Sequence, residues 1–243
     1  MSSSKRKALP KMPWISRGPQ LARSRQIFMT LTRHGLGFLL AASDTDHPVR
    51  SKGLVSMLKQ PSPRQAARLR KALEELGPTF IKLGQALSAR ADLLPAVYVD
   101  ELSKLLDEVP PLPYEQMEVV LIKELGGPPA ELFASLDPEP IASASIGQVY
   151  GAQLKNGQQV VVKIVRPGAL ETFERDMEIM ADIVEWLSNR TVLGQMYDLR
   201  ALLEEFAYTV RNEFDYMREG HNADTFRQNF YSDARVHVPR IYW

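Results

Sequence analysis

Two runs of strand-forming residues joined by a tight turn constrain the fold of this chain more than any other feature. Residues 148–154 and 159–165 read as strands, and the second run is built almost entirely from β-branched side chains. Between them lies Lys155-Asn156-Gly157-Gln158, whose Asn-Gly centre favours a tight hairpin turn. The sequence therefore predicts an antiparallel hairpin, and the segments on either side of it have helical periodicity.

The helical segments are marked by apolar residues three and four positions apart and by Gly and Pro at their ends. Ser62 and Pro63 form a typical helix start, and the residue before Pro95 is disfavoured in a helix. The expected helices are 63–76, 79–94, 100–107, 114–127, 170–189 and 199–220. Residues 236–243 alternate as a strand would, which would leave Trp243 without neighbours. The pattern as a whole predicts an α+β fold.

The composition excludes several classes of protein. The 243 residues include no cysteine and only four histidines, so disulfides, thiol chemistry and most transition-metal sites are ruled out. No stretch approaches the roughly 18 uninterrupted apolar residues of a membrane span. We therefore expect a globular chain with no metal site of its own.

The first 43 residues carry eight basic side chains and no acidic one, although the net charge of the whole chain is only +1. Residues 20–40 have the pattern of a basic amphipathic helix, interrupted at Gly35 and Gly37. Such a helix either lies on an anionic membrane surface or packs on the rest of the chain with its arginines in water. An organelle transit peptide is an alternative. We favour a cytoplasmic location.

One expected helix, 79–94, has two different faces. Phe80, Leu83 and Leu87 share one side, and the other side carries Lys82, Gln85, Ser88 and Asp92. A polar face of this kind is usually solvated, and the pattern alone does not distinguish this from a functional surface.

Two charged residues fall inside apolar patterns. Lys163 interrupts the β-branched run 160–165, where it either extends to the surface or needs an anion. Glu213 falls on the apolar stripe of the expected helix 199–220, or else at its solvated edge. Because a buried acid is costly unless it is paired, we infer that Lys163 and Glu213 form an ion pair.

The segment before the hairpin resembles a phosphate-binding loop in altered form. Protein kinases have G-x-G-x-x-G-x-V before a strand lysine, whereas this chain has A-x-A-x-x-G-x-V. Alanine disfavours positive φ and limits the approach of backbone amides to an anion, so the loop should be stiffer. The loop, the lysine and the helix glutamate Glu213 together predict nucleotide binding, with a cofactor site formed by Ala142, Ser143, Ala144, Ser145, Ile146, Gly147 and Lys163.

These motifs resemble those of the UbiB family of atypical protein-kinase-like proteins, and the resemblance covers the chain from about residue 20. The K-x-G-Q motif of that family stands here as Lys82, Gly84 and Gln85, and it continues through Ser88, Arg90 and Asp92. The family's alanine-rich loop, strand lysine and E-x-D motif match Ala142–Ser145, Lys163 and Glu213-Phe214-Asp215.

The resemblance implies a kinase-like N-lobe with an antiparallel sheet, preceded by a family-specific helical extension whose K-x-G-Q helix lies across the active site. The expected division is a basic arm at 1–60, the extension at 61–130 and an incomplete N-lobe at 131–243, with the C-lobe absent. The catalytic and metal-binding Asp and Asn residues would then lie beyond this chain, which would be an inactive N-terminal fragment, with Lys163 and Glu213 as its catalytic pair.

The resemblance also implies binding of ATP or ADP with Mg²⁺, ATPase activity in preference to protein phosphorylation, and support of ubiquinone-like lipid biosynthesis. Besides the nucleotide, the expected partners are an anionic membrane surface or proteins of lipid biosynthesis, and not nucleic acid. The alternative is a non-catalytic module whose helices and basic arm dock on a partner or a membrane.

Overall fold

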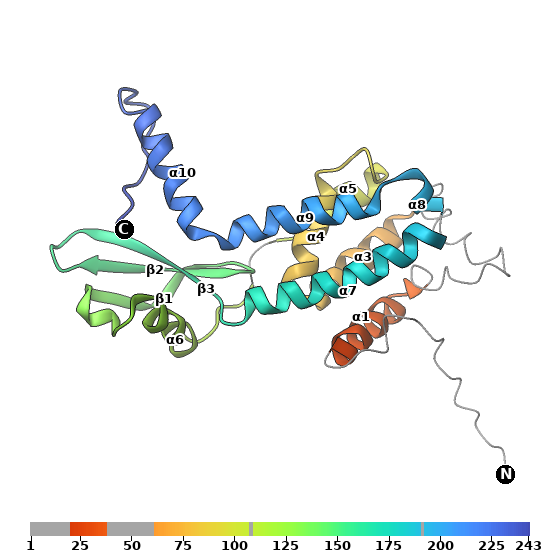
Figure 1. Ribbon diagram of the computed structural model, residues 1–243, viewed down its shortest axis with the longest axis horizontal. Helices are drawn as coiled ribbons and strands as arrows, with labels where there is room; N and C mark the ends of the chain where they lie inside the picture. The colour runs from red at the N-terminus through yellow and green to blue at the C-terminus, as the bar shows by residue number, and fades with distance from the viewer. Residues whose placement is uncertain (1–19, 38–60, 107–108, 191) are drawn as a thin grey trace, which may run out of the picture.

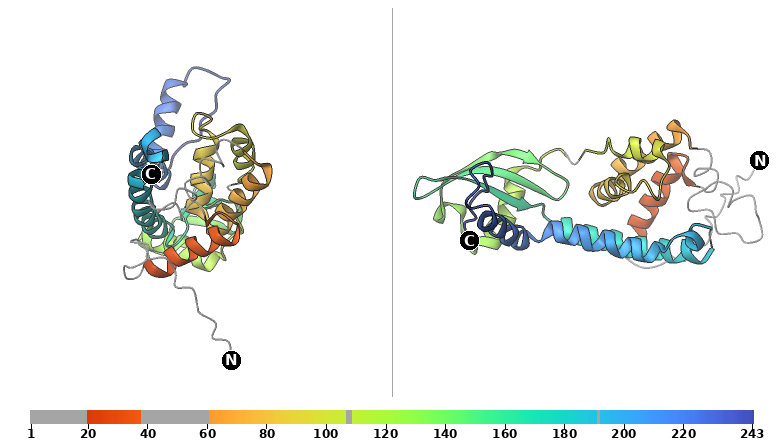
Figure 2. Two further views of the ribbon diagram at one scale, coloured as in Figure 1. Left: turned by 90° about the vertical axis from the view of Figure 1, so that its right-hand side faces the viewer. Right: turned by 90° about the horizontal axis from the view of Figure 1, so that it is seen from above.

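The computed structural model describes residues 20–37, 61–106, 109–190 and 192–243, and it is elongated, with the strands at one end and most helices at the other (Figures 1 and 2). The expected segments at 1–19 and 38–60 lie outside the described residues. The helices are α1 (Leu21–Arg33), α3 (Pro63–Leu76), α4 (Pro78–Ser88), α5 (Ala96–Leu102), α6 (Tyr114–Leu125), α7 (Ala169–Arg190), α8 (Val192–Met196), α9 (Leu199–Phe214) and α10 (Tyr216–Asn229), with a 3-10 turn at Pro129–Glu131.

The sheet has three antiparallel strands in the order β1 (Phe133–Ser143), β2 (Gly147–Leu154) and β3 (Gln159–Val165). The predicted hairpin is confirmed as β2 and β3, which pair without interruption from Gly147 opposite Val165 to Gln153 opposite Gln159. The apolar side of α6 covers the sheet, where Met117 and Leu121 pack with Tyr150 and Ile164.

Strand β1 was not predicted. Pro138 and Pro140 lie inside it and cannot donate backbone hydrogen bonds, and its register against β2 shifts between Leu136 and Pro140. Prolines are tolerated on an edge strand, and this is the position that β1 occupies. The interrupted pattern hid the strand from the sequence analysis.

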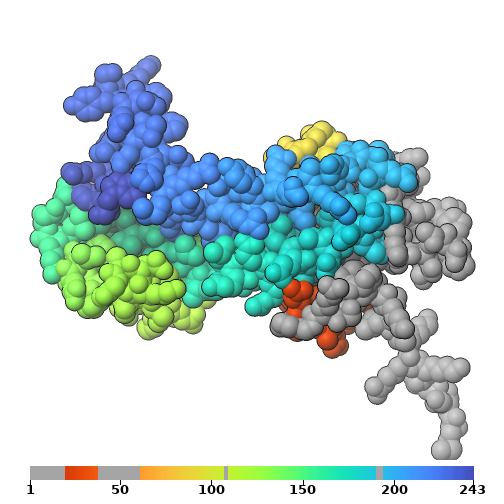
Figure 3. Space-filling view, in the orientation of Figure 1, coloured from red at the N-terminus to blue at the C-terminus, as the bar shows by residue number. Residues whose placement is uncertain are grey.

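The larger hydrophobic core joins helices that are far apart in the sequence. It contains Leu73 and Leu76 of α3, Phe80 of α4, Phe173 of α7 and Phe206 of α9, together with residues of α1 and α5. Helices α7 and α9 lie side by side on one face of the molecule, and α10 projects from it (Figure 3). The helical region therefore supports α9, and the end of α9 reaches the sheet.

Helix α1 is packed on this core through its buried Ile27 and Leu31. Arg23 does not face water: its guanidinium makes two hydrogen bonds to Asp176 of α7, at 2.7 and 2.8 Å, and a third to the carbonyl oxygen of Leu76. The Asp176 side chain is only 1% exposed. One arginine of the basic arm is therefore a structural ion-pair partner, and Arg25 remains exposed.

Three expected boundaries were wrong. Helix α4 ends at Ser88, six residues before the expected Leu94, and Arg90 begins a set of turns that lead into Pro95. Helix α5 starts at Ala96 and ends at Leu102, so it starts four residues before the expected segment 100–107 and overlaps only its first three residues. Residues 234–243 have no strand, and Trp243 folds back to donate a 2.9 Å hydrogen bond to Asp224 and to stack against His221.

The expected helix 199–220 is broken at Asp215, where φ is −86° and ψ is 81°. Asp215 caps the next helix, because its side chain accepts a 2.9 Å hydrogen bond from the backbone N–H of Arg218. The break changes the direction of the chain between α9 and α10 (Figure 1). It also changes which side chains share a face, and Met217, expected in the buried stripe, is 62% exposed.

Candidate functional site

An open cavity of about 480 Å³ lies between the sheet and the bend that joins α9 to α10. The alanine-rich turn contributes Ala142, Ala144, Ile146 and Gly147, and Val149 and Lys163 come from β2 and β3. The helices provide the polar wall: Thr209, Asn212, Glu213, Tyr216, Arg218, Glu219 and Asn222. The predicted loop and the predicted lysine therefore meet in one pocket.

Lys163 forms an ion pair with Glu219 of α10, with 2.6 Å between Nζ and Oε2. Its ammonium group also lies 4.4 Å from the ring centroid of Tyr216. Both charged side chains are well exposed to the pocket, so this pair contributes little to folding stability. A cation held in an open cavity by one carboxylate and one aromatic face is available to an incoming anion.

Glu213 does not pair with Lys163, and the predicted contact between them is wrong. Its Oε2 atom lies 2.8 Å from Nζ of Lys82, the lysine of the K-x-G-Q motif. The break at Asp215 is the physical reason, because Glu213 ends one helix and Glu219 lies in the first turn of the next. The prediction assumed one continuous helix and so assigned the wrong carboxylate to Lys163.

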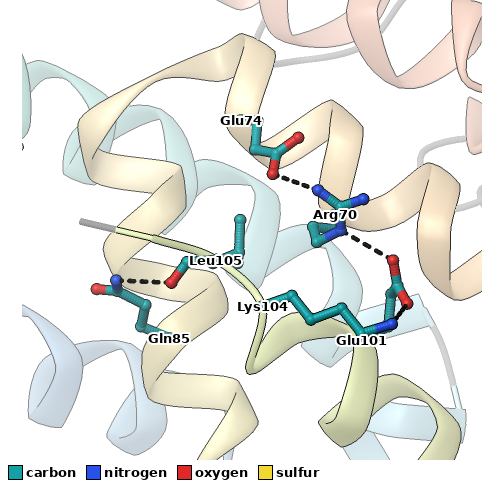
Figure 4. Close-up of polar contacts among 6 residues, drawn as sticks. All are labelled: Arg70, Glu74, Gln85, Glu101, Lys104 and Leu105. Carbon is teal, nitrogen blue, oxygen red and sulfur yellow. Dashed lines mark hydrogen bonds and ion pairs between the residues drawn. The ribbon is translucent and has the colours of Figure 1, made fainter. Parts of the chain in front are cut away.

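The K-x-G-Q motif connects α4 to three neighbours. Lys82 reaches α9, Gln85 donates a 3.2 Å hydrogen bond to the carbonyl oxygen of Leu105 (Figure 4), and Gly84 is pressed against Leu73 and Leu105. A Cβ atom on Gly84 would lie 2.3 Å from the Leu105 side chain. Gly84 is thus required for close packing, and Lys82 meets Glu213, a residue that lines the cavity.

The rest of the polar face has structural partners. Ser88 donates to the carbonyl oxygen of Gln85 at 2.7 Å, and Arg90 makes a two-bond contact with Asp92 beyond the end of α4. The hydrogen bond from Arg90 holds the pKa of the Asp92 carboxyl below its usual value. Close by, Glu101 accepts hydrogen bonds from Arg70 and Lys104, which fixes the chain next to Leu105 (Figure 4).

The alanine-rich turn is narrow and has ordinary backbone angles. Every residue with positive φ in the described ranges is a glycine outside this turn, so the alanines suit the conformation they adopt. Gly147 is needed for space, because a Cβ atom there would lie 2.9 Å from the Ile164 carbonyl oxygen and 2.4 Å from the Tyr216 hydroxyl. The turn therefore lies directly against β3 and Tyr216.

Tyr216, like Glu219, is a site residue that sequence analysis missed, because the pattern placed it inside a continuous helix. Its hydroxyl is buried and has no hydrogen-bond partner among the described residues. Burial, with smaller contributions from Glu219 and Glu213, raises the pKa of Tyr216 to about 12. The hydroxyl is therefore protonated at neutral pH and is a donor without an acceptor.

A lysine on β3 that pairs with a helix acid beneath a small-residue loop defines a protein-kinase-like N-lobe. The model of the ABC1 atypical kinase-like domain matches residues 104–243. The chain belongs to this family of UbiB-type atypical kinases.

Curated relatives agree with this assignment. A probable protein kinase UbiB of Marinobacter nauticus is 38% identical over 227 residues, which is 92% of this chain and 42% of the relative. The chloroplastic protein ACTIVITY OF BC1 COMPLEX KINASE 7 of Arabidopsis thaliana is 43% identical over 76% of this chain and 27% of its own length. The chain thus spans less than half the length of these relatives.

One solved structure provides a fold comparison. The Mycobacterium tuberculosis protein Rv3197, solved in complex with erythromycin, is 32% identical and matches with a TM-score of 0.50. The match covers 79% of this chain and 48% of that structure. Together with the three-stranded antiparallel sheet, this supports the α+β, kinase-like N-lobe expected from the sequence.

Within the described residues, no helix is both long and apolar enough to cross a membrane. The same residues contain no cluster of three or more His, Asp or Glu side chains that could hold a metal ion.

Proposed function

We propose that the pocket beneath the alanine-rich turn binds ATP or ADP, and that Lys163 contacts its phosphates. The observation that carries this proposal is the Lys163 ammonium group, which lies in an open cavity and is oriented by Glu219 and Tyr216. Phosphate groups are favourable partners for a lysine placed in this way. The cavity volume is also in the range of small-molecule sites.

The residues of the pocket fit the phosphates better than they fit the metal. Glu213 and Glu219 are both engaged by lysines, and the described residues hold no carboxylate cluster for Mg²⁺. Mg²⁺, when bound, would neutralise phosphate charge. The family resemblance implies that its protein ligands come from a second lobe.

For the whole protein we propose ATPase activity that supports isoprenoid-quinone biosynthesis, in line with the resemblance to the UbiB family. The position of helix α4 favours ATP hydrolysis over phosphorylation of a protein substrate. Lys82 reaches Glu213 at the cavity wall, which brings this helix against the site. A bulky protein substrate would have to displace that contact.

Replacing Lys163 with methionine tests the nucleotide proposal. We expect MgADP at about a hundred times its Kd to stabilise the original chain by roughly 2.7 kcal/mol, and the variant much less. The measurement is the shift in thermal unfolding temperature with and without MgADP.

Lys155→Met is the matched control, since Lys155 is an exposed lysine in the turn of the same hairpin and should leave the MgADP response unchanged. Equal stabilisation of the original chain and of Lys163→Met would mean that the lysine is not part of the binding site.

A second proposed role, docking on an anionic membrane, is favoured by the outward side of α1. Leu21 and Met29 are 40% and 54% exposed, and the exposed Arg25 lies between them at helical spacing. Apolar side chains with an adjacent cation suit the interface of a bilayer that contains anionic lipids. This side faces away from the core formed by Ile27 and Leu31.

The double variant Arg25→Glu/Met29→Asp should lower sedimentation with vesicles that contain phosphatidylserine, because it removes both the charge and the apolar contact. Lys155→Glu, in the turn between β2 and β3, is the charge control, because the sheet and α1 lie toward opposite ends of the molecule (Figure 1). If the double variant and the original chain sediment equally, α1 does not form the docking surface.

A further inference from the structure

Arg166 lies directly after β3 and binds three neutral acceptors. Its Nε atom donates to the Ala144 carbonyl oxygen at 2.8 Å, and Nη2 donates to the Pro110 carbonyl oxygen at 2.9 Å and to Oγ of Ser143 at 2.7 Å. Its partial burial among these groups lowers the pKa of the guanidinium. A cation placed in this way binds two segments of the backbone to the end of β3.

The first of these segments is the alanine-rich turn. Besides the side-chain contact to Ala144, the backbone N–H of Arg166 donates to the Ile146 carbonyl oxygen at 2.9 Å. The carbonyl oxygens of Ser143 and Gly147 are also occupied, by the amides of Val109 and Ala144. The carbonyl oxygens of Ser143, Ala144, Ile146 and Gly147 are therefore all engaged in hydrogen bonds within the protein.

In contrast to these carbonyl oxygens, some backbone N–H groups of the turn have no hydrogen-bond partner among the described residues. Within the part of the chain that the structure describes, no hydrogen bond from the backbone N–H of Ser145 or Ile146 is found, and of these two residues Ile146 lines the cavity. Free amides in a turn attract anions, whereas free carbonyl oxygens repel them. Because Arg166 hydrogen-bonds to the carbonyl oxygen of Ala144, it keeps the turn in a conformation that can accept a phosphate.

The second segment is residues 109–112, which we call the strap. It contains consecutive prolines at 110 and 111, which have no N–H group, so its backbone is fixed mainly by side chains from outside. The fully buried Gln148 binds both the N–H and the carbonyl of Leu112. Arg166 binds the strap at Pro110.

We propose that Arg166 is a positioning residue of the pocket, which holds the alanine-rich turn in its phosphate-accepting shape and fastens it to the strap. The effect on phosphate binding rests on the nucleotide function proposed above, whereas the connection between strap and turn does not.

Hydrogen exchange of the full 243-residue chain tests the connection without any ligand. Arg166→Met should speed exchange of the Val109 and Ala144 amides by about tenfold, since these amides hydrogen-bond to and within the turn. Arg235→Met, which removes an exposed ion pair with Asp233, is the control and should change neither amide. Unchanged exchange in Arg166→Met would overturn the proposal.

A conservative variant separates positioning from a loss of general stability. Arg166→Lys keeps the charge but not the three-way contact, so it should restore thermal stability and leave the Ala144 amide fast. Full rescue of exchange by lysine would contradict the proposal.

The same variants address the phosphate. Arg166→Met should weaken MgADP binding, measured by calorimetry, by about tenfold. If the original chain does not bind MgADP at all, the proposed nucleotide function of this chain fails, while the exchange results still decide whether Arg166 joins the strap to the turn. If MgADP binds both equally, Arg166 does not position the phosphate site.

Discussion

Replacing Arg23 with methionine is expected to lower the free energy of unfolding by about 3–5 kcal/mol, the largest stability effect that we expect from a single substitution in this chain. The variant would leave the Asp176 carboxylate, which is only 1% exposed, without the two hydrogen bonds that compensate its charge. Burying an unpaired charge costs far more than the intact ion pair contributes. Urea unfolding followed by circular dichroism measures the difference.

Arg33→Met on the same helix is the matched control. Arg33 also pairs with an acid, Glu75, but both side chains are exposed, so its loss should change the free energy of unfolding by less than about 1 kcal/mol. Adding Asp176→Leu to Arg23→Met should recover much of the lost stability, because no charge is then buried. Similar losses for Arg23→Met and Arg33→Met would mean that Asp176 is not buried as described.

Gly147→Ala should destabilise the site region by about 1–3 kcal/mol and should also reduce MgADP binding. The added Cβ would lie 2.9 Å from the Ile164 carbonyl oxygen, which is backbone and cannot move alone, and 2.4 Å from the Tyr216 hydroxyl. Either β2 must separate from β3 or Tyr216 must move into the cavity. Thermal unfolding and MgADP titration together measure both consequences.

Gly151→Ala tests whether the effect is specific to that position. Gly151 lies on the same strand, but its nearest neighbour would be the Ile141 side chain at 3.5 Å, an ordinary contact. The control should therefore cost only a fraction of a kcal/mol. Tyr216→Phe should relieve part of the Gly147→Ala defect, since it removes one of the two close contacts. If both glycine variants behave alike, Gly147 is not limited by space.

The local parts of the site were predictable because they depend on short-range patterns. The Asn156-Gly157 turn fixed the hairpin and therefore the position of Lys163, and the segment 142–147 lies beside it as expected. The resemblance to the UbiB family, which depends on four motifs in order, is confirmed by the match of the ABC1 domain. The predicted nucleotide, metal and membrane partners stay predictions.

The pairing of charges could not be predicted because it depends on a backbone break. Apolar spacing from Leu199 to Met217 continues across Asp215 as if the helix were straight, so the pattern gave no sign that the direction changes there. Asp215 is a good helix cap, and an aspartate within a long helical pattern is the one available signal. The burial of Asp176 likewise depends on tertiary contacts, to Arg23 of a helix far away in the sequence.

Because of the bend at Asp215, the number of residues between Glu213 and Glu219 matters as much for the two ion pairs as the identity of the charged side chains. Two acids, Glu213 and Glu219, engage two lysines that come from separate parts of the chain, one from the helical region and one from the sheet. On an unbroken helix, six positions amount to about 600° of rotation, which would direct the two carboxylates about 120° apart. An inserted or deleted residue between them would thus disconnect one region from the other, even with every charged side chain retained.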